Sequence, residues 1–362
     1  MIPELSQRWP LPSKPRPIVI IGAGGIVRDA HVPAYRQAGF ALGGVYDIKP
    51  EAREAAVADY GIPRSYSSLE EAFAGGYRDL VFDIAVPGNQ VLGILEKAPP
   101  GAALLIQKPM GESLPEAREI LRTCREKSLV AAINFQLRFT PNMLAIRDAL
   151  DRRLFGEITD LEVRINLHTP WELWPFLRGL PRMEVLYHSI HYLDVIRSFL
   201  GEPRRVYCRG VRHPQTPELS DTRTSIILDY GDTIRCSLTM NHAPRFGRKH
   251  AVSRLKIEGT DGAALAKMGV NLDYPKGEPD ELEICLIGGT EQPSWRTVPL
   301  SGSWFPEAFM GPMSNLQRFA AGEDEVLLTS VEDAFKTMAL VEACYRSSAE
   351  GGTLIPSYDE SP

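Results

Sequence analysis

The stretch Ile18-Val19-Ile20-Ile21-Gly22-Ala23-Gly24-Gly25-Ile26-Val27 decides the fold of the first part of this chain. Its run of β-branched apolar residues predicts a buried strand, and Gly22 to Gly25 predict the turn from that strand into a helix. In such a turn the first glycine permits a tight bend, and the second lets the backbone approach a pyrophosphate that the helix N-terminus then stabilises. Val27 stands where the usual fingerprint has a third glycine, so the turn needs support from its surroundings.

That support comes from Asp47, which ends a second apolar run, residues 41–46, 25 positions after Gly22. A carboxylate there accepts hydrogen bonds from the ribose hydroxyls and repels a 2′-phosphate, so it favours NAD over NADP, although Lys49 would soften the preference. The alternative is a glycine turn that binds no dinucleotide. We predict an NAD site, with these residues as contacts: Gly22, Gly24, Gly25, Ile26, Asp47, Pro87, Asn89 and Lys108.

Outward from this site, apolar runs alternate with helical patterns. Strands are predicted at residues 18–21, 41–46, 80–86, 102–106 and 130–135, and helices at residues 51–60 and 114–127. Strands that alternate with helices indicate a doubly wound, mostly parallel sheet. We therefore predict an N-terminal Rossmann domain over residues 18–138, preceded by an extended tail over residues 1–17 that holds five prolines.

After a predicted helix at residues 141–154 the pattern changes to strands in close succession. They are expected at residues 158–168, 205–213, 223–230, 233–242 and 253–258, with helices at residues 185–200, 306–321 and 330–349. Tyr230-Gly231-Asp232-Thr233 predicts a hairpin turn. The sequence thus favours an α+β C-terminal domain, residues 139–362, with a large, open, mostly antiparallel sheet.

Composition limits the classes of function. With 362 residues the chain is long enough for two domains. A net charge of −6 argues against nucleic-acid and anionic-membrane partners, and no apolar run approaches the length of a membrane span. Five scattered cysteines without a Cys-x-x-Cys pair fit reduced thiols, so we expect a cytoplasmic protein.

Several short motifs, in order along the chain, resemble those of the Gfo/Idh/MocA family of NAD(P)-dependent oxidoreductases. Gln107-Lys108-Pro109 lies where that family has Glu-Lys-Pro, and Phe155-Gly156-Glu157-Ile158 resembles its entry into the C-terminal sheet. Asn134, Arg138 and Pro141 resemble its Asn-x-Arg-x-x-Pro region, and residues 257–262 its Gly-Thr-x-Gly turn. The segment 187–194 is similar to its helix with Asp-x-x-x-His, except that Tyr187 replaces the aspartate and Gln107 replaces the glutamate.

The resemblance implies hydride transfer between a nicotinamide and a sugar or polyol, with Lys108, His191 and Tyr187 as catalytic candidates. A lysine and a histidine that converge on one hydroxyl can polarise it and relay its proton. On a regular helix Tyr187, His188 and His191 would share one face. Without a neighbouring carboxylate His191 should be less basic, which weakens its case as the general base. The alternative to a catalytic role is a structural one, in which Lys108 is a surface lysine and His191 is a core histidine.

Further candidates for substrate contacts are Gln136, Arg138, Trp171, Trp174, His188, Arg245 and Phe309, of which the tryptophans could equally be core residues. His188, His191 and Asp194 form too weak a pattern to predict a metal site, and we expect none. Two alternatives to a sugar dehydrogenase stay open: an NAD-dependent glycoside hydrolase and a non-catalytic NAD(P)-binding sensor. The open sheet and the resemblance imply a homo-dimer or homo-tetramer paired through the C-terminal sheet.

Overall fold

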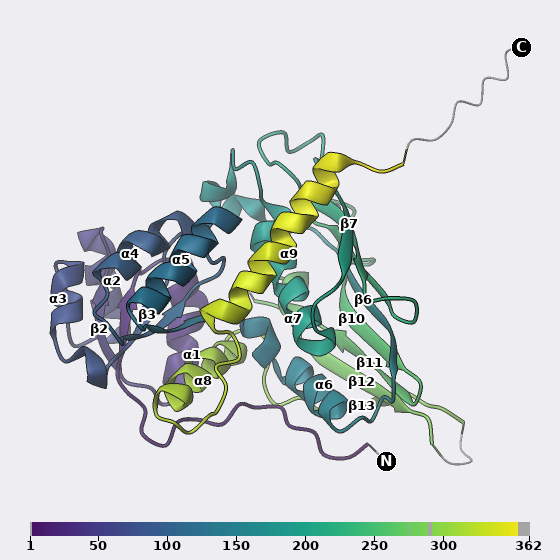
Figure 1. Ribbon diagram of the computed structural model, residues 1–362, viewed down its shortest axis with the longest axis horizontal. Coiled ribbons are helices and arrows are strands. Elements are labelled where there is room, and N and C mark those ends of the chain that lie inside the picture. Colours follow the sequence, from purple (N-terminus) through teal and green to yellow (C-terminus); the bar gives the residue numbers. More distant parts are fainter. Residues whose placement is uncertain (1, 275, 289–291, 354–362) are drawn as a thin grey trace, which may run out of the picture.

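The structure, a computed structural model, describes residues 2–274, 276–288 and 292–353, so that residues 354–362 of the predicted C-terminal domain lie outside the described residues. Within these ranges the strands form two sheets, one in each half of the chain (Figure 1). The predicted fold class, a Rossmann domain followed by a sheet-bearing α+β domain, is confirmed.

The first sheet is parallel, with the strand order β2-β1-β3-β4-β5. Its strands are β1 Ile18–Ile21, β2 Leu42–Tyr46, β3 Val81–Ile84, β4 Ala103–Ile106 and β5 Val130–Ile133. Every residue of β1, β3 and β4 is buried, which is typical of parallel strands covered by helices on both faces. The strand order reverses between β1 and β3, and ligands of doubly wound sheets bind at the carboxyl ends of the strands beside such a reversal.

Helices cover this sheet. They are η1 Val27–His31 (a π-helical turn) with α1 Val32–Gln37, α2 Pro50–Tyr60, α3 Leu69–Ala74, α4 Val91–Lys97 and α5 Leu114–Glu126, with short 3₁₀ turns η2 Tyr77–Asp79 and η3 Gly88–Gln90. Side-chain caps define two of the starts: Ser68 accepts a hydrogen bond from the amide of Glu71, and Ser113 accepts one from the amide of Glu116. Neither α3 nor α4 was predicted from the sequence.

The second sheet has the order β13-β12-β11-β10-β6-β9-β8-β7 in the described part of the chain, and all its neighbours are antiparallel except β6 and β9. Its strands are β6 Ile158–Asn166, β7 Arg205–Val211, β8 Arg223–Asp229, β9 Arg235–Asn241, β10 Val252–Gly259, β11 Gly262–Lys267, β12 Glu281–Leu286 and β13 Arg296–Thr297. Buried and exposed residues alternate along β8, so only one face of this sheet lies in the core. The hairpin predicted at residues 230–233 joins β8 to β9.

The remaining helices lie mainly between the two sheets, and Figure 1 shows α6, α7 and α9 on the side of the second sheet that faces the Rossmann domain. The longest, α9, contacts α5, α7 and β7 and so ties both domains together. The elements are η4 Gln136–Phe139, α6 Pro141–Asp151, η5 Trp171–Leu173, η6 Pro175–Leu177, η7 Val185–Ser189, α7 Ile190–Leu200, η8 Gly269–Leu272, η9 Glu307–Phe309, α8 Met310–Ala320 and α9 Val331–Glu350.

The segment before β1 has neither helix nor strand over residues 2–17, and it packs against the C-terminal half of the chain. The Trp9 indole N–H donates to Asp324 Oδ2 at 3.0 Å, and its ring meets Phe139 edge-on at 5.7 Å. The amide of Arg16 donates to Gln317 Oε1 at 2.7 Å. These contacts fasten the tail beside α8. Among the described helices none is long and apolar enough to cross a membrane.

Candidate active site

The glycine turn lies at the carboxyl end of β1, beside the segment that follows β3. Gly22 has a φ of +98°, and its amide donates to Tyr46 O at 2.8 Å. A Cβ at Gly22 would lie 2.4 Å from Ala85 O, so no other residue fits there. At Gly24 no heavy atom lies within 4 Å of the position a Cβ would take, and the helical turn begins directly after it. This backbone fits a dinucleotide pyrophosphate at a helix N-terminus.

Asp47 lies next to this turn, immediately after β2. Its Oδ2 accepts the amide of Ala23 at 2.7 Å, and its Oδ1 accepts the amide of Lys49 at 2.9 Å. The structure therefore brings the acidic residue and the glycine turn together, as a ribose site requires. Arg53 donates to the main-chain oxygen of Asp47 at 2.9 Å, so a guanidinium also contacts this residue.

Pro87 and Asn89 are exposed in the turn after β3, at the same edge of the sheet. Gly25 and Ile26 lie at the start of the helix that follows β1. The predicted NAD contacts thus lie around the carboxyl ends of β1 to β4, beside the reversal of strand order, and ligands of this fold class bind at such a position.

Lys108 follows β4, one residue beyond Gln107. Its Nζ donates a hydrogen bond to the main-chain oxygen of Tyr187 at 2.7 Å, across the boundary between the domains. Burial lowers the pKa of Lys108 from 10.5 to about 8. Gln107 Oε1 accepts the amide of Lys108 at 3.2 Å, so the residue that replaces the family's glutamate supports the backbone of the lysine.

The segment that carries Tyr187 and His188 is a π-helical turn, not the regular helix that the sequence analysis expected over residues 185–200. The wider turn gives the three side chains different surroundings. The Tyr187 phenol donates to Glu112 Oε1 at 3.1 Å, whereas His188 packs against His242 with 4.2 Å between ring centroids. Only the main-chain oxygen of Tyr187 has a hydrogen bond with the lysine. Turns of this kind recur at functional sites.

His191 lies one turn further along, in α7, and is buried with its ring edge-on to Trp304 at 5.6 Å. Its Nδ1 has no hydrogen-bond partner among the described residues. Burial and the positive charge of Lys108 hold the pKa of His191 well below its ordinary value, so the ring is neutral at physiological pH. A neutral imidazole can accept or donate one hydrogen bond to a substrate hydroxyl.

Trp171 and Trp174 lie beside the histidines and are half-buried. The Trp171 ring meets the His242 ring edge-on at 5.2 Å, and the Trp174 ring lies 5.0 Å from that of Tyr274. Two half-buried indoles can contact the apolar face of a sugar ring.

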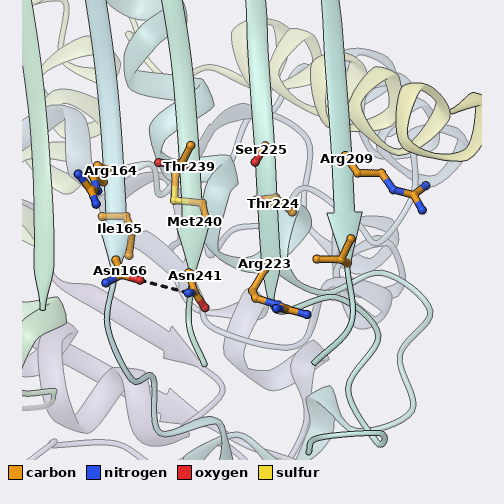
Figure 2. Close-up of a pocket in the computed structure, with 11 residues that line it drawn as sticks. Arg164, Ile165, Asn166, Arg209, Arg223, Thr224, Ser225, Thr239, Met240 and Asn241 are labelled. Atoms are coloured by element: carbon orange, nitrogen blue, oxygen red, sulfur yellow. Dashed lines mark hydrogen bonds between the residues drawn. The ribbon is translucent and has the colours of Figure 1, made fainter. Parts of the chain in front are cut away.

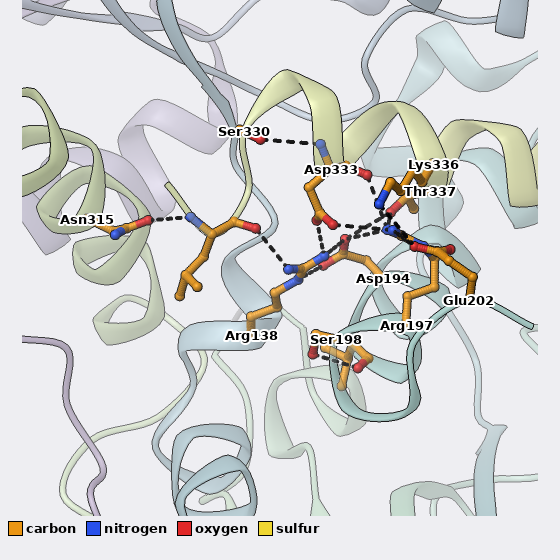
Figure 3. A network of polar contacts seen from close by, with 12 residues as sticks. Arg138, Asp194, Arg197, Ser198, Glu202, Asn315, Ser330, Asp333, Lys336 and Thr337 are labelled. Atoms are coloured by element: carbon orange, nitrogen blue, oxygen red, sulfur yellow. Dashed lines mark hydrogen bonds and ion pairs between the residues drawn. The ribbon is translucent and has the colours of Figure 1, made fainter. Parts of the chain in front are cut away.

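Two predicted substrate contacts, Arg138 and Phe309, make structural contacts instead. The Arg138 guanidinium binds Asp194 at 2.5 and 2.6 Å, Asp333 at 2.5 Å and the main-chain oxygen of Leu328 at 3.0 Å (Figure 3). Phe309 is fully buried against His31 and Phe305. Both side chains are occupied by structural contacts, so we keep neither in the proposed substrate site.

Gln136 and Arg245 are the remaining predicted substrate contacts. Gln136 is buried, and its Oε1 has no hydrogen-bond partner among the described residues. Arg245 is exposed in the loop after β9. Both stay predictions.

The metal set that the sequence analysis rejected is not assembled, because Asp194 binds Arg138 and Thr337 instead. The described residues bring together a different set, Glu184, His188 and His242. Glu184 and His242 were not predicted from the sequence. The spacing of Glu184 and His188, four residues apart, was a usable signal, but nothing local indicated His242, which comes from the end of β9.

Two family models match this chain. Residues 16–135 match the model of the oxidoreductase family with an NAD-binding Rossmann fold, and residues 143–265 match the GFO/IDH/MocA C-terminal domain. A D-apiose dehydrogenase of Paraburkholderia graminis is 27% identical, over 92% of this chain and 88% of its own length. An inositol 2-dehydrogenase of Rhizobium meliloti is 24% identical, over 91% and 96%.

Solved structures show the same fold. An oxidoreductase from Agrobacterium radiobacter, in complex with NAD⁺, L-tartaric acid and magnesium, superposes with a TM-score of 0.77 at 22% identity, covering 94% of this chain and 98% of its own. A levoglucosan dehydrogenase in complex with NADH and levoglucosan gives a TM-score of 0.74 at 17% identity, covering 93% and 98%. The chain belongs to the Gfo/Idh/MocA family of oxidoreductases.

Proposed function

We propose that this chain is an NAD-dependent dehydrogenase that oxidises a hydroxyl group of a sugar or polyol. The observation that carries the proposal is Lys108, which the main-chain oxygen of Tyr187 holds at the carboxyl end of β4, and whose charge acts on the buried imidazole of His191. With a pKa of about 8, the lysine can exchange a proton near physiological pH. Bound NAD⁺ supplies the hydride acceptor.

Within this site the two side chains have different roles. Lys108 takes the hydroxyl proton during oxidation and returns it during reduction. His191, whose pKa lies well below its ordinary value, positions the same hydroxyl as a neutral hydrogen-bonding partner. The main-chain oxygen of Tyr187 accepts the hydrogen bond from Lys108 Nζ. The phenol of Tyr187 donates to Glu112, and in our proposal Tyr187 supports the position of the lysine.

The preference for NAD over NADP rests on Asp47. Its carboxylate already accepts two main-chain N–H groups beside the glycine turn, and a ribose hydroxyl would bind in the same place. A 2′-phosphate would meet that negative charge.

The substrate class rests on the relatives and on the two indoles. The curated relatives include dehydrogenases of D-apiose and of inositol, both polyhydroxylated compounds. Trp171 and Trp174 offer apolar ring faces, while Lys108, His188 and His191 offer polar groups nearby. That combination suits a ligand with both C–H faces and hydroxyl groups.

The test is incubation of the purified protein with NAD⁺ and a panel of pentoses, hexoses, anhydrosugars and inositols, monitored by NADH absorbance. Stoichiometric NADH formation with at least one compound supports the dehydrogenase. Cleavage of aryl glycosides without net NADH would point to the hydrolase alternative. NAD binding with neither reaction across the panel, in both directions, would point to the sensor.

We also propose that two chains pair through the outer face of the second sheet. Tyr207 and Ile227 are cross-strand neighbours on β7 and β8, and they are 56% and 53% exposed. Beside them lies a hollow of about 370 Å³ that Arg164, Arg209 and Arg223 help to line (Figure 2). Exposed apolar side chains on an open sheet face favour burial against a second copy.

All five cysteines are free thiols, which supports a cytoplasmic location.

A further inference from the structure

Three side chains from two distant segments converge next to the proposed active site. His242 Nε2 lies 3.3 Å from Glu184 Oε1, and His188 Nδ1 lies 3.5 Å from the same oxygen. One ligand atom from each residue falls within 4.8 Å of the others. In a tetrahedral site with metal–ligand bonds of about 2.0–2.1 Å, ligand atoms are separated by about 3.3 Å.

The negative charge of Glu184 in this cluster has no lysine or arginine partner among the described residues. Glu184 is fully buried, and its ion-pair partners among the described residues are the two histidines, not a lysine or an arginine. Asp221 adds a second carboxylate, because its Oδ1 accepts the amides of Met183 and Glu184 at 3.1 and 3.2 Å. Buried carboxylates without a cation are costly, and a bound metal ion removes that cost.

Hydrogen bonds from neighbouring groups orient the three side chains. His242 Nδ1 lies 2.7 Å from Thr169 Oγ1, which leaves Nε2 directed at Glu184. Thr224 donates to Glu184 Oε2 at 2.6 Å, so the carboxylate is held from its other side. His188 Nδ1 is buried and has no hydrogen-bond partner among the described residues. Histidines that ligate metals are characteristically oriented in this way through the second ring nitrogen.

We propose that Glu184, His188 and His242 bind a divalent first-row transition ion, with Zn²⁺ as the best match. One carboxylate and two imidazoles form a ligand set that leaves coordination positions open, as in catalytic zinc sites. The set suits Zn²⁺ better than Mg²⁺, which prefers oxygen ligands. The opening is on the side of His188, whose side chain is 15% exposed while the other two are fully buried.

The cluster of Glu184, His188 and His242 lies next to the segment that holds Lys108. His188 directly follows Tyr187, whose main-chain oxygen accepts a hydrogen bond from Lys108 Nζ at 2.7 Å. An ion at this point could coordinate oxygen atoms of a ligand beside Lys108. The binding site itself does not depend on the proposed dehydrogenase activity.

The experiment measures metal binding without NAD or sugar. Protein stripped with a chelator is dialysed and titrated with Zn²⁺, and with Co²⁺ as a visible-absorbing probe. We expect about one ion per chain, with no comparable binding of Mg²⁺. Glu184→Gln, His188→Gln and His242→Gln should each weaken binding by at least about 100-fold, and Thr169→Val by about 10–100-fold, since the threonine only orients a ligand. His250→Gln, at an exposed histidine, is the matched control.

Unchanged NAD titration shows that each variant is folded, and His188→Gln and Thr169→Val perturb the buried core least. Failure of the wild type to bind either ion, or unchanged stoichiometry and affinity in both His188→Gln and Thr169→Val, would overturn the proposal. Either result would leave the dehydrogenase assignment untouched, because that assignment is tested by NADH formation.

Discussion

Lys108 Nζ donates a hydrogen bond to the main-chain oxygen of Tyr187 at 2.7 Å, which joins the end of β4 in the Rossmann domain to the π-helical turn before α7. The contact uses a backbone atom, so it does not depend on which side chain occupies position 187. It holds the lysine where the carboxyl-end edge of the first sheet meets the segment of the second domain that carries the histidines. The replacement of the family's aspartate by Tyr187 therefore leaves the position of the lysine supported.

The pH dependence of turnover should follow Lys108. Its pKa is lowered to about 8 by burial, so the neutral, proton-accepting form predominates above that pH. For oxidation we expect kcat/KM to rise with pH and to level off above about pH 8, and for reduction to fall over the same range. Initial rates across the pH range in both directions test this. A flat profile from pH 6 to 10 would exclude the lysine as the titrating group.

Lys108 and His191 should behave as one unit in mutagenesis. We expect Lys108→Ala and His191→Ala each to lower kcat by about 10²–10⁴-fold, and the double variant to lose far less than the product of the two. Lys249→Ala, at an exposed lysine in the loop after β9, is the control and should keep full activity. NAD titration and melting temperature separate chemistry from misfolding. Near-full turnover of His191→Ala would remove the histidine from the mechanism.

The Rossmann half was well predicted from sequence, because its strands are buried on both faces and read as continuous apolar runs. Every predicted strand of the first sheet is present, within two residues at either end. In the second sheet β11, β12 and β13 were missed, since Gly262–Lys267 is rich in alanine and glycine, and Glu281–Leu286 and Arg296–Thr297 are short. Strand β11 forms because its backbone pairs with β10 and β12, and not because its residues have a high β-strand propensity.

Residues of the site were predictable where one short motif carries them and not where distant segments meet. Lys108 and the glycine turn come from local patterns. The contact of Lys108 with the Tyr187 main chain, and the position of His242 beside Glu184, depend on tertiary packing. The π-helical turn also changed the expected geometry, because a regular helix would have given Tyr187, His188 and His191 a common face.

Asp47 should set the cofactor preference. We expect NAD to bind at least ten-fold more tightly than NADP, a difference of about 1.4 kcal/mol. Asp47→Ser should narrow or reverse that preference, because Lys49 and Arg53 remain beside the ribose position without a carboxylate. Titration of intrinsic tryptophan fluorescence with each cofactor measures both affinities. Equal affinities in the wild type would contradict the assignment of Asp47 to the ribose.

The Arg138 network should contribute mainly to stability. Arg138 is almost fully buried and joins η4 to Asp194 on α7 and Asp333 on α9 (Figure 3). Arg138→Met leaves the buried Asp194 without its main partner, and we expect the free energy of unfolding to fall by about 3–5 kcal/mol. The double variant Arg138→Met/Asp194→Asn should recover part of the loss. Chemical denaturation of the three proteins provides the comparison, and a loss below about 1 kcal/mol in the single variant would refute the role.

The outer face of the second sheet should mediate assembly. Tyr207 and Ile227 lie opposite each other in the β7–β8 pair, and Figure 2 shows the arginine-lined hollow on the same sheet. Two glutamates there would place like charges against their copies in a symmetric contact, because a two-fold interface brings the same patch of both subunits together. We expect the wild type to be a dimer or tetramer and Tyr207→Glu/Ile227→Glu to dissociate at micromolar concentration, as measured by light scattering. Phe246→Glu, at a residue that is 95% exposed in the loop after β9, is the matched control and should leave the mass unchanged. A monomeric wild type would refute the assembly, whereas a double variant that keeps the wild-type mass would move the interface to another face of the molecule.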